Sequence, residues 1–211
     1  MQELSHRVSS GMPTYPGDPS VDVESVAEYD RDGYRNSRLI CGTHAGTHVD
    51  APAHTEAGGR SLDSYPPSAF VRQARLVDCS GLAAGTAVSA DAVPAVGPEI
   101  DCLLFYTGWD EHWGSEQYRD HPFLSPAAAQ RCAAQGVAVG IDTFGPDPTA
   151  SARESGASPT GYPAHHAILG SGTLLFENLT KLGELPMEVE LRALPLRVPA
   201  EAAPVRAVAV W

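Results

Sequence analysis

The sequence predicts a mixed α/β fold in a single domain. The length of 211 residues suits one domain of ordinary size, and 43% apolar residues are enough to build a core. Twenty glycines and 18 prolines indicate many turns, short strands and few long helices. A strand–helix–strand pattern near the middle of the chain adds the helical layer. We therefore expect residues 1–211 to form one domain.

The central pattern predicts two buried, parallel strands joined by a helix. Residues 100–106 and 137–141 are short apolar runs of the kind that form buried strands. Between them, Ser125 suits a helix N-cap, Pro126 the first helical position, and Gly136 the left-handed stop. A helix that connects two neighbouring strands normally leaves those strands parallel.

Other elements are predicted from shorter patterns. The segment 15–19, with Pro16 and Gly17, is typical of a tight turn. A second helix is expected to begin near Ser64 or Ser68. Alternating or clustered apolar residues predict four further strands, at 38–41, 71–78, 187–198 and 205–210.

Composition excludes several classes of partner. The formal net charge is −12, so the basic surface that binds nucleic acid or anionic membranes is not expected. No segment approaches about 18 consecutive apolar residues, and we expect no membrane span. The first residues lack the apolar run of a signal peptide, which predicts a cytoplasmic protein. The four cysteines are scattered, with no Cys-x-x-Cys pair, and are expected to be reduced thiols.

The most informative segment runs from residue 44 to residue 54. A helix would split its polar side chains between two faces, whereas an extended chain points all even-numbered positions to one side. A straight strand would still separate His44 from His48 by roughly 13 Å, and Gly46 could bend it. Pro52 would then end the strand. A single histidine is more often structural, but four ligand-type residues share this register: His44, His48, Asp50 and His54.

This donor set predicts a divalent metal ion with an open position. Imidazole and carboxylate together favour Zn²⁺, Mn²⁺ or Fe²⁺ over Ca²⁺ and Mg²⁺, which prefer oxygen ligands. A second cluster follows at His165 and His166, and Glu177 lies inside an apolar run where an unpaired carboxylate would be costly to bury. Only one of two consecutive histidines points easily at a shared centre, and the sequence leaves that choice open.

Residues 44–54 match every fixed position of the His-x-Gly-Thr-His-x-Asp-x-Pro-x-His signature. This signature identifies the chain as similar to the cyclase family of metal-dependent hydrolases, which includes bacterial kynurenine formamidase and isatin hydrolase. The resemblance extends along nearly the whole chain. Further matching segments in family order are 15–18, 107–109, 140–143, the pair His165 and Glu177 with residues 178–179, and 204–206.

The resemblance implies a swivelling β/β/α fold, a homodimer or higher homo-oligomer, and one or two divalent ions, Zn²⁺ or Mn²⁺. It implies hydrolysis of an amide, formamide or lactam C–N bond in a small aromatic substrate. In this analogy His54 donates and accepts the proton. The implied metal ligands are His44, His48 and a bridging Asp50 for the first ion, and His165 and Glu177 for the second.

The substrate pocket is less defined by the sequence. Tyr15 stands where the compared kynurenine formamidases have Trp, which weakens a specific prediction of N-formylkynurenine as substrate. We expect Tyr15 and Trp109 to contact the substrate, with Trp113 and Phe144 as further candidates, although each is also a reasonable core residue. Asp142 follows a predicted strand and could either contact the site or cap a turn.

Two other functions remain open at this stage. The same centre could catalyse a cyclisation or dehydration in a natural-product pathway, or the protein could bind a ligand without catalysis. The sequence lacks Gly-x-Ser-x-Gly, His-Glu-x-x-His and Gly-x-Gly-x-x-Gly. Serine hydrolases, zincins and dinucleotide-binding proteins of the usual kinds are therefore not expected.

Overall fold

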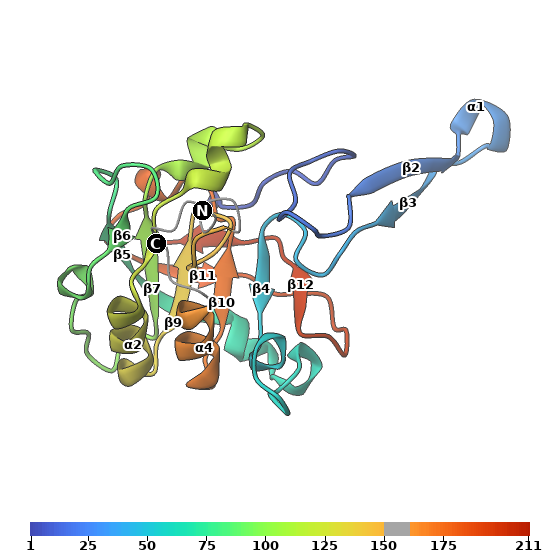
Figure 1. Cartoon of the computed structure of the whole chain (residues 1–211). Helices are drawn as coiled ribbons and strands as arrows, with labels where there is room; N and C mark the ends of the chain where they lie inside the picture. The colour runs from blue at the N-terminus through green and yellow to red at the C-terminus, as the bar shows by residue number, and fades with distance from the viewer. Residues whose placement is uncertain (150–160) are drawn as a thin grey trace.

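A mixed β-sheet runs through the molecule (Figure 1). The computed structural model describes residues 1–149 and 161–211. Within these residues the main sheet has nine strands in the order β1-β13-β11-β5-β7-β9-β10-β4-β12. Their bounds are Gln2–Glu3 (β1), His48–Asp50 (β4), Val71–Asp78 (β5), Cys102–Tyr106 (β7), Ala138–Ile141 (β9), Leu175–Glu177 (β10), Glu188–Arg192 (β11), Ala202–Pro204 (β12) and Val208–Val210 (β13).

The centre of the sheet is parallel, as the strand–helix–strand pattern predicts. Strands β5, β7, β9 and β10 run parallel, and the outer strands pair antiparallel. Helices α2 (Pro126–Gln135) and α4 (Pro163–Gly170) pack together against one face (Figure 1). Leu103 lies under these helices, whereas the next residue, Leu104, lies in the core on the opposite face. The central strands are therefore buried on both sides.

The sequence places helix α2 correctly. Ser125 is its N-cap, and the Ser125 hydroxyl oxygen accepts a hydrogen bond of 3.1 Å from the Ala128 amide. Pro126 occupies the first turn, and Gly136 ends the helix with φ 67°. The predicted strands at 38–41, 71–78, 100–106 and 137–141 are also confirmed, each within a few residues.

Two predicted elements are wrong in form or extent. No long helix begins near Ser64 or Ser68; the chain makes two short 3-10 helices, η2 (Leu62–Ser64) and η3 (Pro67–Phe70). Pro66 holds an extended ψ of 154° between them, because a residue that precedes a proline disfavours the helical region. The predicted strand 187–198 ends at Arg192, and Pro195 makes only an isolated bridge to Val205.

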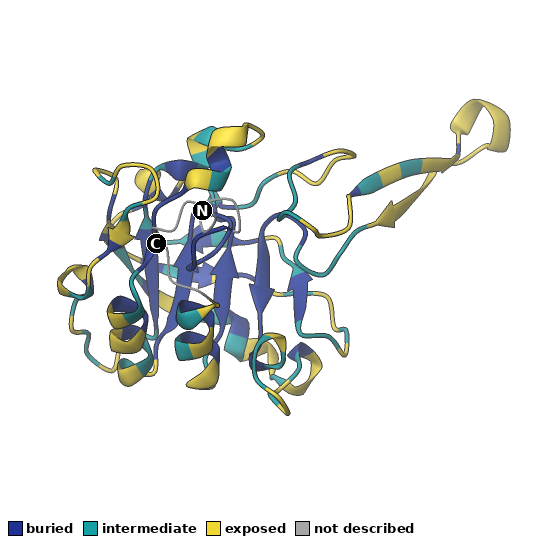
Figure 2. Ribbon diagram, viewed as in Figure 1, coloured by how far each residue is buried: buried dark blue, intermediate teal, exposed yellow. Residues whose placement is uncertain are grey.

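A hairpin arm projects from the body of the molecule (Figure 1). It consists of β2 (Asp22–Ala27) and β3 (Asn36–Ile40), which pair antiparallel, with α1 (Tyr29–Asp32) at its tip. Most of the arm is exposed, in contrast to the central sheet (Figure 2). Its exposed apolar side chains include Val23, Val26, Tyr29, Tyr34, Leu39 and Ile40.

The remaining elements are short and lie around the sheet. Two two-residue strands, β6 and β8, pair parallel beside helix α2. Their bounds and those of the other 3-10 helices are Ala87–Val88 (β6), Phe123–Leu124 (β8), Pro52–His54 (η1), Ala90–Ala92 (η4), Trp109–His112 (η5), Glu116–Asp120 (η6) and Leu182–Glu184 (η7).

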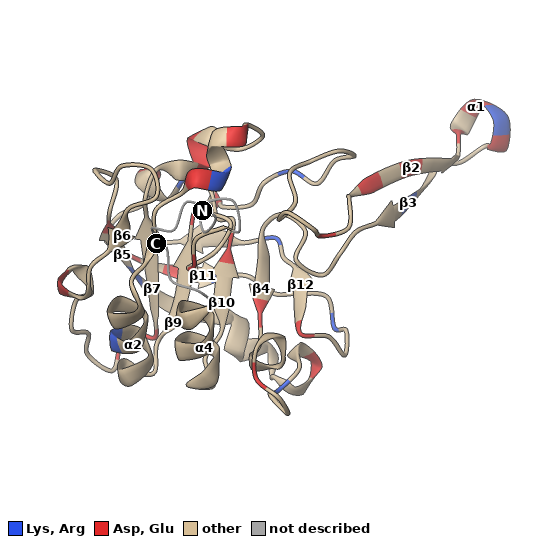
Figure 3. Ribbon diagram, viewed as in Figure 1, with Lys and Arg blue, Asp and Glu red and all other residues tan. Residues whose placement is uncertain are grey.

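Charged residues lie mostly in the arm, the loops and the outer elements of the ribbon (Figure 3). The Lys and Arg residues are dispersed along it rather than gathered in one stripe (Figure 3). Among the described residues, no helix combines the length and apolar character needed to cross a lipid bilayer.

Candidate metal centre

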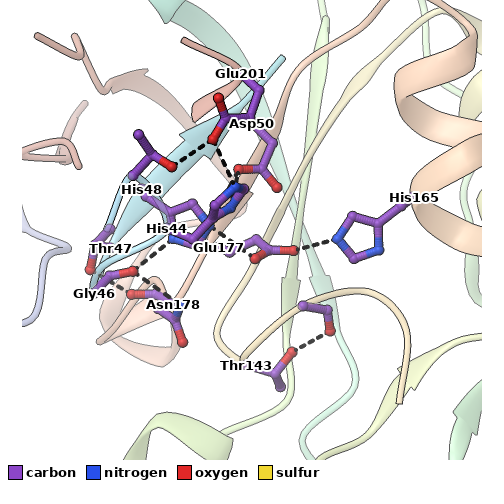
Figure 4. Close-up of polar contacts among 12 residues, drawn as sticks. His44, Gly46, Thr47, His48, Asp50, Thr143, His165, Glu177, Asn178 and Glu201 are labelled. Carbon is purple, nitrogen blue, oxygen red and sulfur yellow. Dashed lines mark hydrogen bonds and ion pairs between the residues drawn. The ribbon is translucent and has the colours of Figure 1, made fainter. Parts of the chain in front are cut away.

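Strand β4 supplies the first half of the site. Gly46 takes a positive φ of 63°, and this bend brings His44 back beside the strand. The Nδ1 atom of His44 lies 3.2 Å from the Nε2 atom of His48. Both nitrogens face the same carboxylate oxygen, because Oδ1 of Asp50 is 3.1 Å from His44 Nδ1 and 3.3 Å from His48 Nε2 (Figure 4).

The second half of the site comes from β10 and α4. Glu177 pairs with His48 in the register of β10 and β4, so its side chain reaches the same side of the sheet. Its Oε2 atom is 3.1 Å from His48 Nε2, and its Oε1 atom is 3.2 Å from His165 Nε2 (Figure 4). Glu177 therefore links the histidines of the two halves.

His54 lies over the opening between these halves. The 3-10 helix that starts at Pro52 carries His54, whose ring centroid is 4.3 Å from that of His44 and 5.6 Å from that of His165. Two groups of ligand atoms each lie within 4.8 Å of one another: His44, His48 and Asp50, and Asp50, His54 and His165. Asp50 belongs to both groups.

The donor set fits a divalent cation. Both carboxylate oxygens of Asp50 and the Oε1 atom of Glu177 are buried and have no hydrogen-bond partner in the described part of the chain. Such carboxylates are costly to bury unless a cation compensates them. Imidazole nitrogens surround them, and this mixture of nitrogen and oxygen donors suits Zn²⁺ or Mn²⁺.

The histidines of the site differ in their electrostatic surroundings. Burial lowers the pKa of His165, but the nearby carboxylates of Asp147 and Glu177 outweigh burial and raise this pKa to about 10. Burial is also the main influence on His54 and lowers its pKa below the ordinary value. The His54 imidazole is therefore neutral near neutral pH and can accept a proton.

The structure distinguishes His165 from His166 and shows what Asp142 contacts. His165 points into the site, whereas the neighbouring His166 is mostly exposed and pairs with Glu56, with Nδ1 and Oε1 2.8 Å apart. Asp142 caps a loop: its carboxylate accepts hydrogen bonds from the backbone amide and hydroxyl of Thr107 and from the backbone amide of Gly108. Asp142 does not line the cavity described next.

A cavity of about 570 Å³ opens over these side chains. Tyr15 and Phe144 form part of its wall, and their ring centroids are 6.0 Å apart in an edge-to-face arrangement. The structure places Trp109 elsewhere, since it is buried in an aromatic cluster with Tyr118 and Phe144 and does not line the cavity. Its indole N–H donates to the backbone carbonyl of Gln117 at 3.3 Å, which fixes the ring away from the opening.

Comparison with known proteins identifies the family. The model of the Cyclase family matches residues 2–148. The chain belongs to the cyclase family. A curated relative, the kynurenine formamidase of Salinibacter ruber, is 34% identical over 98% of this chain and 95% of its own length. The family and hydrolase class that the signature predicts are therefore confirmed.

Solved structures confirm the predicted fold. An isatin hydrolase bound to the product analogue thioisatinate superimposes with a TM-score of 0.85 at 22% identity, covering 98% of this chain and 90% of that one. Isatin hydrolase A from Labrenzia aggregata, bound to benzyl benzoate, gives a TM-score of 0.84 at 24% identity, covering 98% and 91%. This cyclase-family chain thus has the mixed α/β fold of these proteins.

Sequence reasoning missed two residues that support the site of this cyclase-family protein. Asp147 contacts His165, with Oδ2 2.7 Å from Nδ1. Asn178 takes a left-handed φ of 53°, which asparagine tolerates, and donates from Nδ2 to the Gly46 carbonyl at 3.0 Å. The sequence feature that could have indicated Asn178 as a site residue is its position directly after Glu177. Asp147 lies in a Gly-Pro-Asp-Pro segment, whose composition is typical of a simple turn.

Proposed function

We propose that this cyclase-family protein hydrolyses the C–N bond of an amide, formamide or lactam in a small aromatic substrate, using one or two divalent ions, Zn²⁺ or Mn²⁺. One observation carries the proposal. Both carboxylate oxygens of Asp50 and the Oε1 atom of Glu177 lack hydrogen-bond partners among the described residues, yet imidazole nitrogens lie close to them beside a cavity that Glu177 lines.

The proposed ligands follow from which atoms face one another. Nδ1 of His44 and Nε2 of His48 converge on Asp50 and would hold the first ion with it. Nε2 of His165 and the carboxylate of Glu177 would hold the second, with Asp50 shared between the two. When bound, the cation supplies the positive charge that makes water acidic near neutral pH and polarises a substrate carbonyl.

His54 is the group that we assign to proton transfer. It lines the cavity, and no hydrogen bond to another described residue holds its ring nitrogens. Because burial keeps its imidazole neutral, His54 can accept a proton from the attacking water. The resulting imidazolium can then return this proton to the leaving nitrogen of the substrate.

The aromatic substrate class rests on the cavity wall and on the relatives. Tyr15 and Phe144 offer ring faces and edges next to the histidines, an arrangement suited to a flat aromatic ring. The curated relative is named kynurenine formamidase, and two structural relatives are named isatin hydrolases. We therefore favour aryl formamides and aryl lactams as substrates.

A direct test is turnover of N-formylaniline and isatin by protein with a measured metal content. We expect hydrolysis of at least one of them, a product heavier by one water for the lactam, and loss of activity after chelation that Zn²⁺ or Mn²⁺ restores. A product lighter by one water from a suitable open-chain substrate would instead indicate dehydrative cyclisation. Bound metal without turnover of any amide, ester or lactam would favour a binding protein.

We also propose that residues 1–211 act as one domain and assemble as a homodimer or higher homo-oligomer. Strands β1 and β13, from opposite ends of the sequence, pair in the sheet that carries the site. The exposed apolar residues of the hairpin arm, such as Leu39 and Ile40, favour burial against another copy. Light scattering of the purified protein measures this mass directly.

A further inference from the structure

Three imidazoles of the site have an acceptor behind the nitrogen that faces away from Asp50 and Glu177. Nδ1 of His48 lies 2.8 Å from the Gly46 carbonyl oxygen, and Nε2 of His44 lies 3.5 Å from Oε1 of Glu201. Nδ1 of His165 lies 2.7 Å from Oδ2 of Asp147, which makes this contact the shortest of the three. It is also the only one of them made by a buried carboxylate.

Asp147 accepts three hydrogen bonds with its two oxygens. Oδ1 accepts from the backbone amide of Ala164 at 3.0 Å, and Oδ2 accepts from the backbone amide of His165 at 3.0 Å. The imidazole of His165 donates the third, also to Oδ2. The same carboxylate therefore binds the first turn of α4 and the ring that α4 carries.

From this geometry we propose that Asp147 is a positioning residue of the metal centre: it holds the proton of His165 on Nδ1, so that the lone pair of Nε2 faces Glu177 and the shared ion. The inference rests on the function proposed above. Asp147 itself is not one of the proposed ligands, because both of its oxygens are occupied by N–H donors on the far side of the ring.

The arrangement fixes more than the proton. Oδ2 of Asp147 accepts hydrogen bonds from both the ring and the backbone amide of His165. The ring therefore cannot rotate about χ1 or χ2 without losing its hydrogen bond. The loop that carries Asp147 is held in turn: the Pro146 carbonyl accepts from the Leu124 amide at 2.8 Å, and Thr143 donates to the Gly145 carbonyl at 2.9 Å. His165 is thus set relative to the sheet and not only to its helix.

The chemistry requires a carboxylate at this position. An asparagine would present one oxygen and one NH₂ group to three N–H donors, so at least one donor would lose its acceptor. Asp147→Asn therefore keeps the size of the side chain but removes its negative charge and changes its hydrogen bonding. Asp147→Ala removes all three bonds.

The test measures metal binding by the full-length chain, independently of turnover. Zn²⁺ and Mn²⁺ dissociation constants are obtained by competition with a chelator, and bound ions per chain by elemental analysis. For Asp147→Asn and Asp147→Ala we expect affinity to fall about 10- to 100-fold, with the weaker-bound ion lost first. Ser125→Ala is the matched control, because it removes the corresponding cap of α2, which lies outside the site.

The control separates positioning from helix capping. If Asp147 only caps α4, its variants lower Tm by a few degrees, as Ser125→Ala does, and bind metal as tightly as the wild type; that result overturns the inference. If Asp147→Ala fails to fold, the metal affinity is measured on Asp147→Asn instead. A wild-type protein that binds neither ion would refute the proposed function and this inference together, whereas unchanged affinity in the variants refutes the inference alone.

Discussion

The two halves of the metal centre are built in different ways. The β4 half takes His44, His48 and Asp50 from residues 44–50, where a short strand and one glycine bend bring the three side chains together. The other half collects Asp147, His165 and Glu177 from a loop, a helix and a strand. A short motif can therefore encode half of a site locally, while the partner half depends on tertiary pairing.

Asp50 is where the two halves meet, so its loss should have the largest effect. Asp50→Asn keeps the shape but removes the charge that faces His44 and His48. We expect both ions to be lost and turnover of N-formylaniline or isatin to become undetectable. Elemental analysis and product chromatography measure these effects. Asp101→Asn, which alters a carboxylate outside the site, should retain metal and activity; normal metal content in Asp50→Asn would show that the halves do not share this ligand.

Substitution of His54 tests whether this residue transfers protons or binds metal. His54 belongs to the motif of residues 44–54, but it makes no ion pair with the other site residues. We expect His54→Ala to lower kcat by about 10²-fold or more while most of the bound metal remains. Steady-state kinetics and elemental analysis on the same sample make the measurement. Intact turnover would remove His54 from the mechanism, and loss of the metal would reassign it as a ligand.

Acid should destabilise the scaffold next to the second half. His121 is buried near Phe144, with ring centroids 6.5 Å apart, and burial lowers its pKa to about 4. His121 therefore binds a proton near pH 6.5 in the unfolded chain but only near pH 4 in the folded protein. The free energy of unfolding should fall as pH drops from about 6.5 to about 4, by at most roughly 3 kcal/mol. Urea unfolding of the wild type and His121→Asn across this range tests it; parallel curves would contradict the assignment.

The glycine bend of the β4 half should show the smallest effect on stability. Gly46→Ala places a Cβ in a left-handed conformation and 2.6 Å from the flexible end of Met12, at a cost of about 1–2 kcal/mol. Gly85→Ala has the same φ of 63° in open space and is the control. We expect similar losses in Tm but a weaker metal affinity only in Gly46→Ala, because the Gly46 carbonyl contacts His48. Equal metal affinities in the two variants would show that the conformation at Gly46 does not affect the metal site.

The sequence predicts best what local rules determine. Helix α2 follows from Ser125, Pro126 and Gly136, since caps act within one turn of the chain. Strands β7 and β9 follow from uninterrupted apolar runs. The structure brings His44, His48, Asp50 and His54 close together, with the bend at Gly46 and the turn at Pro52 that the sequence suggests, although only residues 48–50 form a strand.

The remaining features depend on contacts that spacing does not reveal. Asp147 is far in sequence from the α4 residues it caps, and only the packing of that helix on the sheet brings them together. The hairpin arm has exposed residues on both faces, so its sequence lacks a clear inside–outside alternation. Trp109 is predicted to contact the substrate as an aromatic candidate for an apolar pocket, but the 3-10 helix η5 places it in a buried aromatic cluster.

The edge of the sheet beside the site has a consequence for handling the protein. Strand β4 is separated from that edge only by β12, a strand of three residues whose Pro204 pairs with His48. A proline cannot donate a backbone hydrogen bond, and so short a strand offers little template to a passing chain. Concentrated solutions should therefore resist aggregation through this edge.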